Sequence, residues 1–229
     1  NFPEPLLNPP WRLVAFIDYP LRTDHLPTVF ICLLHFESGR MTSEEGMVPD
    51  GEECFHLLNR YAVPQNVIEH SRAVLRIARI LCRELNRRGE RMDPSLVEAA
   101  SLLHDIAKVP SFQTGENHSQ AGARLLRELG FPEVAEIVRQ HVVLDPETDQ
   151  GRITEAVVVH YADKRVKHVA VVSLGERFQD LKDRYGKSPE ARAWLDALEG
   201  QSRSIEDRIF RKIPLSPEDL SEPSDRELP

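Results

Sequence analysis

The stretch Ala99-Ala-Ser-Leu-Leu-His-Asp-Ile-Ala-Lys108 places a histidine and an aspartate side by side after a run of mostly apolar residues. It is preceded by Asp93-Pro94-Ser95, which is typical of a helix N-cap followed by a proline in the first turn. A helix from there to Lys108 would bring His104 and Asp105 to the edge of a hydrophobic core. An unpaired charge in such a place costs several kcal/mol, and a metal ion is one of the few partners that satisfies both side chains at once.

The helical pattern continues on both sides of this stretch, from about residue 51 onward. Apolar residues recur there at intervals of three and four, which is the spacing of an amphipathic helix. The expected helices cover residues 52–61, 64–88, 94–108, 118–129, 132–143, 153–169, 173–185 and 189–213, and residues 109–115 are expected to form a loop. The sequence therefore predicts an all-α fold, in which the helices pack as a bundle around one core.

The two ends of the chain differ from this helical part. Residues 1–50 are rich in proline and show little helical periodicity, so they are expected to form an irregular N-terminal extension to which the sequence assigns no role. Residues 51–186 are expected to form the main helical domain, and 187–213 a C-terminal helix that packs on its core. Residues 214–229 are rich in Pro, Ser, Asp and Glu and are expected to be a disordered tail.

Composition narrows the choice of partners and location. The chain of 229 residues carries a formal net charge of −8, whereas proteins that bind long nucleic acids normally present a basic surface, so no such partner is expected. The cysteines, Cys32, Cys54 and Cys82, are far apart and form no Cys-x-x-Cys pair, as in proteins of a reducing compartment. The apolar runs are shorter than the roughly 18 residues that a membrane span needs. No membrane contact is therefore expected, and the expected location is the cytoplasm.

Six side chains that can bind a metal are distributed over the expected helices. They are His70, His104, Asp105, His118, His141 and Asp163. Only His104 and Asp105 share a helix, and a helical bundle builds a metal site in its core from side chains of different helices. A single histidine on an apolar helix face is more often a core residue, so the prediction depends on the whole set. Imidazole and carboxylate ligands together favour divalent ions such as Mn, Fe, Co, Ni, Zn or Mg.

The order of these residues resembles the HD phosphohydrolase superfamily. The segment Leu102-Leu-His-Asp-Ile-Ala-Lys108 is similar to the HDIG-type core, with Ala107 where that subgroup often has glycine. The segment His160-Tyr-Ala-Asp-Lys-Arg165 resembles the family motif that ends in the last aspartate. The resemblance covers about residues 55–186, so that 51–186 would be the HD domain. It implies a five-helix core with the metal site between the helices.

The resemblance also implies how the metal ligands are shared. The ligands of a first ion match His70, His104, Asp105 and Asp163, and the ligands added in binuclear members match His118 and His141. In those members Asp105 would bridge two divalent ions, and a hydroxide between the ions attacks phosphorus. For His118 the sequence leaves one alternative open, an exposed residue at the start of its helix.

Two basic residues are expected to contact substrate. Lys108 matches a lysine of the family's His-Asp-x-x-Lys arrangement that contacts substrate phosphate, so it is expected to be catalytic and substrate-binding. The alternative for Lys108 is a solvated lysine at a helix C-terminus, which the helix dipole favours. Of the three basic residues that follow Asp163, Arg165 is selected as a second substrate-binding residue. His160 is expected to be a residue at the edge of the core, with orientation of Asp163 as the alternative.

The function that the resemblance implies is a metal-dependent phosphohydrolase. It would be a phosphomonoesterase or phosphodiesterase acting on a small nucleotide or related phosphate ester through a metal-bound hydroxide. Two alternatives fit the same residues: a mixed-valent diiron oxygenase of the HD type, and a non-catalytic regulatory HD module. No phosphate-binding loop, dinucleotide fingerprint or serine-hydrolase motif occurs in the sequence. A homodimer is left open, with the N-terminal extension as a candidate contact.

Overall fold

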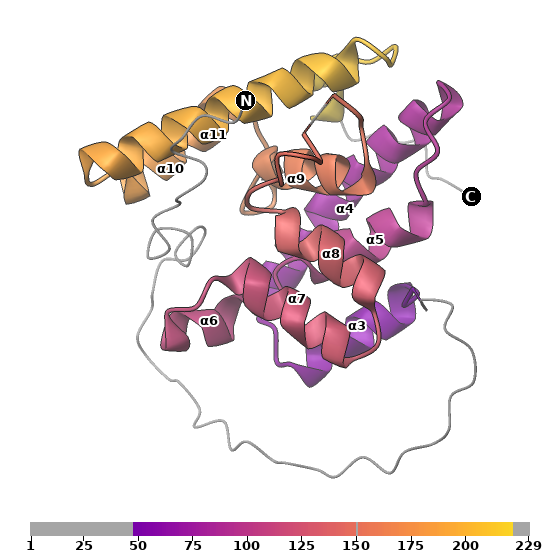
Figure 1. The fold of residues 1–229 in the computed structure, drawn as a ribbon, viewed down its shortest axis with the longest axis vertical. Coiled ribbons are helices and arrows are strands. Elements are labelled where there is room, and N and C mark those ends of the chain that lie inside the picture. The colour runs from indigo at the N-terminus through magenta and orange to yellow at the C-terminus, as the bar shows by residue number, and fades with distance from the viewer. Residues whose placement is uncertain (1–47, 150, 222–229) are drawn as a thin grey trace.

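The structure is a computed structural model that describes residues 48–149 and 151–221, and its elements are labelled as in Figure 1. The helices are α3 (Gly51–Arg60), α4 (Gln65–Arg87), α5 (Pro94–Leu103), α6 (Lys108–Thr114), α7 (His118–Glu128), α8 (Pro132–Gln140), α9 (Glu155–Lys164), α10 (Leu174–Tyr185), α11 (Pro189–Phe210) and the 3-10 helix η1 (Pro217–Leu220). Two short strands, β1 (Val166–Lys167) and β2 (Ala170–Val171), follow α9. The predicted all-α bundle is confirmed, and the predicted irregular segment lies, up to residue 47, outside the described residues.

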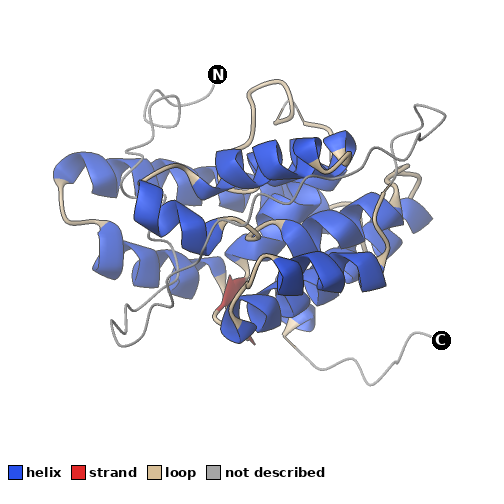
Figure 2. Cartoon of the chain, turned by 90° about the horizontal axis from the view of Figure 1, so that it is seen from below, coloured by secondary structure: helices blue, strands red, loops and turns tan. Residues whose placement is uncertain are grey.

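The centre of the bundle is made by α4, α5, α8 and α9. Helix α4 packs against α5 and α9, and α5 in turn contacts α8, α9 and α3. Helices α10 and α11 form a hairpin across one side of the molecule that reaches the bundle where α11 contacts α9 (Figure 1). Seen from below, helices make up most of the described chain, joined by loops and accompanied by one small β element (Figure 2).

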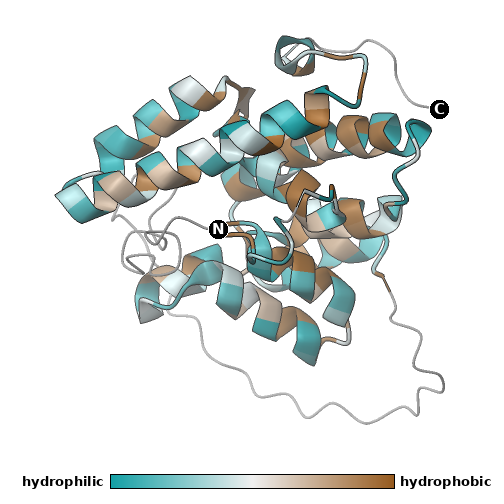
Figure 3. Cartoon of the chain, turned by 45° about the horizontal axis from the view of Figure 1, so that its top comes forward, coloured by the Kyte–Doolittle hydropathy of each residue, from teal (hydrophilic) through white to brown (hydrophobic). Residues whose placement is uncertain are grey.

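Hydropathy explains why these helices pack in this way. The outward surfaces are mostly hydrophilic, and the hydrophobic residues turn toward neighbouring helices (Figure 3). In α4 the buried side chains include Val67, Val74, Ile77 and Leu81, which recur at the spacing of one helix face. None of the helices within the described ranges is long and apolar enough to cross a membrane.

Local capping signals set the starts of the helices that carry the site. The Asp93 side chain accepts a hydrogen bond from the backbone N–H of Ser95, and Pro94 occupies the first turn of α5, as the sequence predicts. Asn117 caps α7 in the same way by accepting from the N–H of Ser119 at 2.9 Å. This cap makes His118 the first residue of α7.

The segment after Leu103 differs from the sequence-based expectation. The predicted helix through to Lys108 ends at Leu103, and residues 104–107 form a hydrogen-bonded turn. The predicted loop at 109–115 is instead the short helix α6, which contains Pro110 in its first turn, where a missing N–H costs no helical hydrogen bond. The turn matters for the site, because it redirects the chain at the two residues His104 and Asp105.

The segment after Asp163 also differs. The helix predicted to reach residue 169 ends at Lys164 and is followed by the antiparallel pairing of β1 with β2. The valines of this segment favour extended backbone over helix. His168 sits in the hairpin turn with φ of 56°, the left-handed conformation that a two-residue hairpin needs. The hairpin brings the His168 carbonyl back to α4.

The chain beyond α11 is ordered further than the sequence predicts. The segment expected to be a disordered tail forms η1 in its described part, where Ser216 and Asp219 make a capping box. Leu220 is buried at 2% exposure and packs in the hydrophobic core. This apolar contact offsets the entropy lost on ordering the polar segment around it. Residues 222–229 lie outside the described part of the chain.

Candidate metal centre

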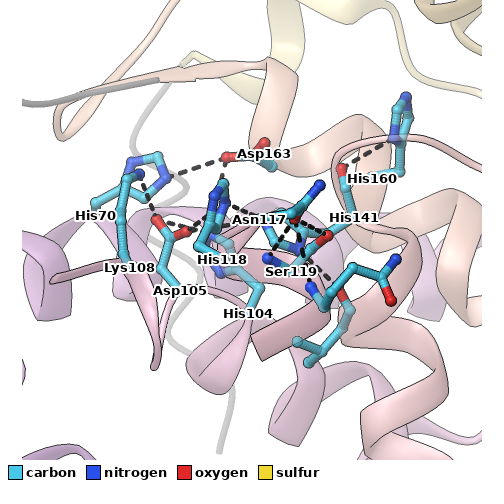
Figure 4. Close-up of polar contacts among 12 residues, drawn as sticks. His70, His104, Asp105, Lys108, Asn117, His118, Ser119, His141, His160 and Asp163 are labelled. Atoms are coloured by element: carbon cyan, nitrogen blue, oxygen red, sulfur yellow. Dashed lines mark hydrogen bonds and ion pairs between the residues drawn. The ribbon is translucent and has the colours of Figure 1, made fainter. Parts of the chain in front are cut away.

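Four helices and the turn after α5 bring the six predicted metal-binding side chains together. His70 comes from α4, His104 and Asp105 from the turn after α5, His118 from the start of α7, His141 from the C-cap of α8 and Asp163 from α9. All six are buried, with exposures between 0% and 5%. Figure 4 shows them turned toward one another. The arrangement excludes the alternative that His118 is an exposed residue at a helix start.

One half of the cluster consists of His70, His104 and Asp163. The Nε2 atom of His70 lies 3.2 Å from Oδ1 of Asp163, and Nε2 of His104 lies 3.7 Å from the same oxygen. His104 Nε2 is also 3.3 Å from Oδ2 of Asp105, which links this half to the rest of the cluster. One donor atom from each of these three residues therefore lies within reach of a common ion.

The other half consists of Asp105, His118 and His141. Oδ1 of Asp105 lies 3.4 Å from His118 Nε2 and 3.7 Å from His141 Nε2, and the two nitrogens are 3.1 Å apart. Donors that each bind an ion at about 2.1 Å lie roughly 3.0–3.4 Å from one another. The spacing of both halves is therefore close to what shared ions require, and Asp105 faces both.

Backbone carbonyls fix the orientation of the histidine rings. The Nδ1 atoms of His70, His104 and His141 lie 2.8, 2.9 and 2.7 Å from the carbonyl oxygens of His168, Ser101 and Val138. A carbonyl only accepts, so each Nδ1 must carry a proton, and in the neutral ring each Nε2 then keeps a lone pair. Metal-binding histidines in proteins are commonly held in this way by the ring nitrogen that does not touch the metal.

Three buried polar atoms of the six cluster residues lack a hydrogen-bond partner within the described part of the chain. They are Nε2 of His104, Oδ1 of Asp105 and Nδ1 of His118. Leaving buried polar groups unsatisfied costs about 1–3 kcal/mol each. The His104 and Asp105 atoms point into the cluster, and both are of the type that binds divalent cations. The residues present therefore fit a divalent metal ion.

Each carboxylate of the cluster is also paired with a buried lysine. Lys108 Nζ donates to Oδ2 of Asp105 at 2.7 Å, and Lys164 Nζ donates to Oδ2 of Asp163 at 2.6 Å. Lys108 is thus at the cluster and is not a solvated residue at a helix end. Lys164 was not selected from the sequence, although it directly follows Asp163. Neighbours in a helix point about 100° apart, and only the length of the lysine lets it reach back.

The electrostatics of the cluster favour ionised carboxylates. Burial alone would raise the pKa of Asp105 and Asp163, but neighbouring lysines and histidines hold both well below the usual range. Lys108 and His104 have this effect on Asp105, and Lys164, with His70 and His104, has it on Asp163. These carboxylates are in the charge state that binds metal.

Burial lowers the pKa of two histidines of the cluster, which keeps their rings neutral. Burial lowers the pKa of His118 to about 4, and burial with the nearby His104 and His118 lowers that of His141 well below its usual range. His104 is the exception, since Asp105 and Asp163 outweigh the effect of burial and raise its pKa. A proton on His104 therefore competes with a metal ion for Nε2 as the pH falls.

The structure does not bring Arg165 to the cluster. Its guanidinium donates to the Tyr161 hydroxyl at 2.6 Å, to the Val172 carbonyl at 2.7 Å and to the Pro217 carbonyl at 2.9 Å. It also lies 3.2 Å from a carboxylate oxygen of Glu206. Arg165 therefore joins the end of α9 to the residue after β2, to α11 and to η1, which corrects the prediction that it turns toward the substrate. The basic residue that faces Asp163 is Lys164, which precedes Arg165 by one position.

Replacing Arg165 by methionine is expected to reduce the free energy of unfolding by about 3 kcal/mol, because Glu206 loses the partner of a largely buried ion pair. Urea unfolding measures the change. The matched control is Arg203→Met, which removes an exposed arginine of α11 and is expected to cost less than about 0.5 kcal/mol. A raised KM without loss of stability in Arg165→Met would instead favour a substrate-binding role.

Acidification is expected to destabilise the metal-free protein. The folded-state pKa is about 4 for His118 and about 3 for His160, against about 6.5 in an unfolded chain. Below about pH 6.5 these histidines therefore bind protons in the unfolded chain but stay neutral in the folded chain. The free energy of unfolding that is present at pH 7.5 is consequently lost as the pH falls. Each of the two histidines contributes a loss of about 1 kcal/mol at pH 5.5, while His104, whose pKa is raised, acts in the opposite sense.

Urea unfolding in chelator at pH 7.5 and pH 5.5 measures this dependence. His160→Asn provides the comparison, since its amide can still donate to the carbonyl that His160 contacts but does not titrate. The difference in unfolding free energy between the two pH values should shrink by about 1 kcal/mol in this variant. An unchanged difference would mean that His160 is not neutral in the folded protein.

Comparison with known proteins agrees with this geometry. Residues 67–166 match the family model described as the HD domain. An uncharacterized protein of Methanocaldococcus jannaschii, MJ0778, is 32% identical over 137 residues, which cover 54% of this chain and 80% of that protein. This chain belongs to the HD-domain superfamily. Its helical fold and its buried His/Asp cluster are what this membership predicts, and HD domains bind divalent metals.

Two further relatives of this HD-domain chain carry functional names. The tRNA (cytidine(56)-2'-O)-methyltransferase of Thermoplasma volcanium is 27% identical over 174 residues, which cover 68% of this chain and 49% of that protein. Ribonuclease Y of Aquifex aeolicus is 35% identical over 105 residues, which cover 45% of this chain and only 17% of the ribonuclease. No solved structure matches the chain significantly.

Proposed function

We propose that this HD-domain protein is a metal-dependent phosphohydrolase, a phosphomonoesterase or phosphodiesterase that acts on a small nucleotide or related phosphate ester. The observation that carries the proposal is the position of the Asp105 carboxylate. One of its oxygens faces His118 and His141, and the other faces His104 and Lys108. A carboxylate between two sets of imidazoles, with an ammonium beside it, suits the transfer of a negatively charged group.

In this proposal the cluster holds two divalent ions. The residues that would hold the first are His70, His104, Asp105 and Asp163, and those that would hold the second are Asp105, His118 and His141. Divalent ions bound there lower the pKa of water and offset charge on a phosphate group. Mn, Fe, Co, Ni, Zn and Mg all accept imidazole and carboxylate ligands, so the donor set supports this group of ions.

The chain's own part in the reaction is to bind and orient the phosphate. Lys108 is buried, and an ammonium in a site with little water interacts strongly with a phosphate oxygen. Occupation of the cluster by cations would repel the ammonium from the Asp105 carboxylate, which leaves Lys108 to donate to substrate. The carbonyls that hold Nδ1 of His70, His104 and His141 keep the rings in place, so little reorganisation is needed when substrate arrives.

Substrate size is inferred from charge and burial. The net charge of −8 disfavours a long polyanion, and the cluster residues are almost inaccessible. The relative named ribonuclease Y supports hydrolysis of a phosphate ester as the reaction, although this chain covers a small part of it. Another relative is named as a methyltransferase. We do not propose methyl transfer for this chain, because its buried imidazole and carboxylate groups suit a divalent cation.

The test is metal analysis of protein purified without added metal, followed by assays on a panel of nucleotides with Mn, Co, Ni and Mg. Release of phosphate or a nucleotide product with one of these ions is the expected result. Failure to hydrolyse any member of the panel by metal-loaded protein would reject the proposal. Bound iron together with oxygen consumption would indicate the diiron oxygenase instead.

Replacing Lys108 by methionine is expected to lower kcat/KM by about 10²–10³-fold, because a donor aimed at the phosphate is removed. Metal content should stay unchanged, since an ammonium does not bind metal. Lys108→Arg keeps a cation and should recover part of the activity. Equal activities of wild type and Lys108→Met would remove Lys108 from the proposed reaction.

A further inference from the structure

Helix α8 ends at the metal cluster, and its last carbonyl is held by two side chains of α9. The carbonyl oxygen of His141 accepts from Nδ1 of His160 at 3.0 Å and from Nζ of Lys164 at 3.2 Å. Carbonyls at a helix C-terminus lack a partner within the helix and carry the negative end of the helix dipole. Two donors, one of them cationic, are therefore a favourable cap for this end of α8.

The two donors occupy one face of α9. His160 and Lys164 are four residues apart, the spacing that places side chains on the same side of a helix. Both are buried, at 0% and 1% exposure, so their contacts with His141 are not competed by bulk water. Figure 4 shows the His160 ring beside the backbone of His141, away from the other labelled cluster residues.

Lys164 extends this contact into the other half of the cluster. The same Nζ atom that donates to the His141 carbonyl donates to Oδ2 of Asp163 at 2.6 Å. That leaves Oδ1 of Asp163 to face His70 and His104. A continuous chain of contacts thus runs from His160 through His141 and Lys164 to Asp163.

This series of contacts connects residues that belong to different halves of the metal cluster. His141 stands with Asp105 and His118, and Asp163 stands with His70 and His104. His141 comes from the end of α8 and Asp163 from α9, so the separation of these two ligands depends on how α8 sits against α9. Groups that hold metal ligands in place commonly change metal affinity by about 10–100-fold when they are removed.

We propose that His160 and Lys164 are positioning residues that set the separation between the two halves of the metal cluster. Loss of either contact weakens the pairing of two ions more than it weakens the binding of one ion. The inference rests on the binuclear site of the proposed function, but it concerns metal binding without substrate. It gives His160 a role toward His141, where the sequence suggested a core residue or a partner of Asp163.

The experiment uses Mn(II) as the probe on the full chain after removal of metal. Bound Mn is counted during titration, and electron paramagnetic resonance distinguishes a spin-coupled pair of ions from isolated ions. Wild type is expected to bind two ions with a coupled spectrum. His160→Leu and Lys164→Met are expected to bind the first ion with affinity within about threefold of wild type and the second about 10–100-fold more weakly, with loss of the coupled signal.

Two conservative variants and one control separate positioning from general damage. His160→Asn keeps an N–H donor at the place of Nδ1 and is expected to retain the coupled spectrum. Lys164→Gln keeps a neutral donor and should recover part of the affinity for the second ion. Lys182→Met removes a lysine that pairs with Asp196 and Glu199 on the α10–α11 hairpin, and it should leave both ions unaffected. Should His160→Leu fail to fold, the Lys164 pair decides the outcome.

The inference is overturned if His160→Leu and Lys164→Met keep a coupled spectrum and a second-ion affinity within about threefold of wild type. It is also overturned if the variants lower the affinity for both ions equally. Binding of a single ion by wild type would overturn it too, because there is then no spacing between two ions to set. A coupled spectrum in wild type without hydrolysis of any nucleotide would reject the proposed function alone. The two failures are therefore distinguishable.

Discussion

Replacing Asp105 by asparagine is expected to lower kcat/KM for phosphate-ester hydrolysis by about 10³-fold or more. The substitution keeps the shape of the side chain and removes its charge. Oδ1 of Asp105 faces His118 and His141, and Oδ2 faces His104. No other side chain in the described part of the chain contacts both halves of the cluster with separate oxygens, so its loss affects both proposed ions at once.

Activity and metal content should be measured on the same Asp105→Asn preparation. Bound metal is expected to fall below that of wild type, since an amide is a much poorer ligand for a divalent ion than a carboxylate. The control is Asp196→Asn, which removes a carboxylate on α11 that pairs with Lys182 and should leave activity and metal unchanged. Full hydrolysis by Asp105→Asn would contradict the proposed reaction.

Removal of metal is expected to abolish hydrolysis and lower the melting temperature by about 8–16 °C. A ligand present at about a thousand times its dissociation constant stabilises the folded state by about 4 kcal/mol. For a protein of this size each kcal/mol shifts Tm by about 2–4 °C. The metal-free cluster leaves His104 Nε2 and Asp105 Oδ1 without a hydrogen-bond partner among the described residues, which is one physical source of this stabilisation.

Thermal unfolding with chelator, and again after Mn(II) is restored, measures the shift. Hydrolysis and Tm should return together. In the Asp105→Asn variant the shift should be much smaller, because the site that gains from metal is impaired. Identical Tm values for chelated and metal-loaded wild type would show that the ions do not bind the buried cluster.

The sequence alone determined the helical fold and the members of the cluster. Asp93 and Asn117 mark helix starts because a cap depends on contacts within three residues. The apolar spacing of α4 identifies its buried face because helix geometry is local. The six residues of the cluster were predictable because buried imidazoles and carboxylates in apolar helices favour a cation, and because their order resembles a known family.

Only the tertiary structure decided how those residues are joined and supported. The turn at 104–107 and the hairpin after Lys164 replaced predicted helix, because these segments make contacts with distant elements, such as that of the His168 carbonyl with His70, which the local pattern does not reveal. Whether Lys164 or Arg165 faces Asp163 depends on where α9 ends, which residue spacing does not specify. The His141 carbonyl, which accepts from His160 and Lys164, is a backbone group with no signature in the sequence. Contacts between residues so far apart along the chain are set by the packing of whole helices, and only the folded chain contains that information.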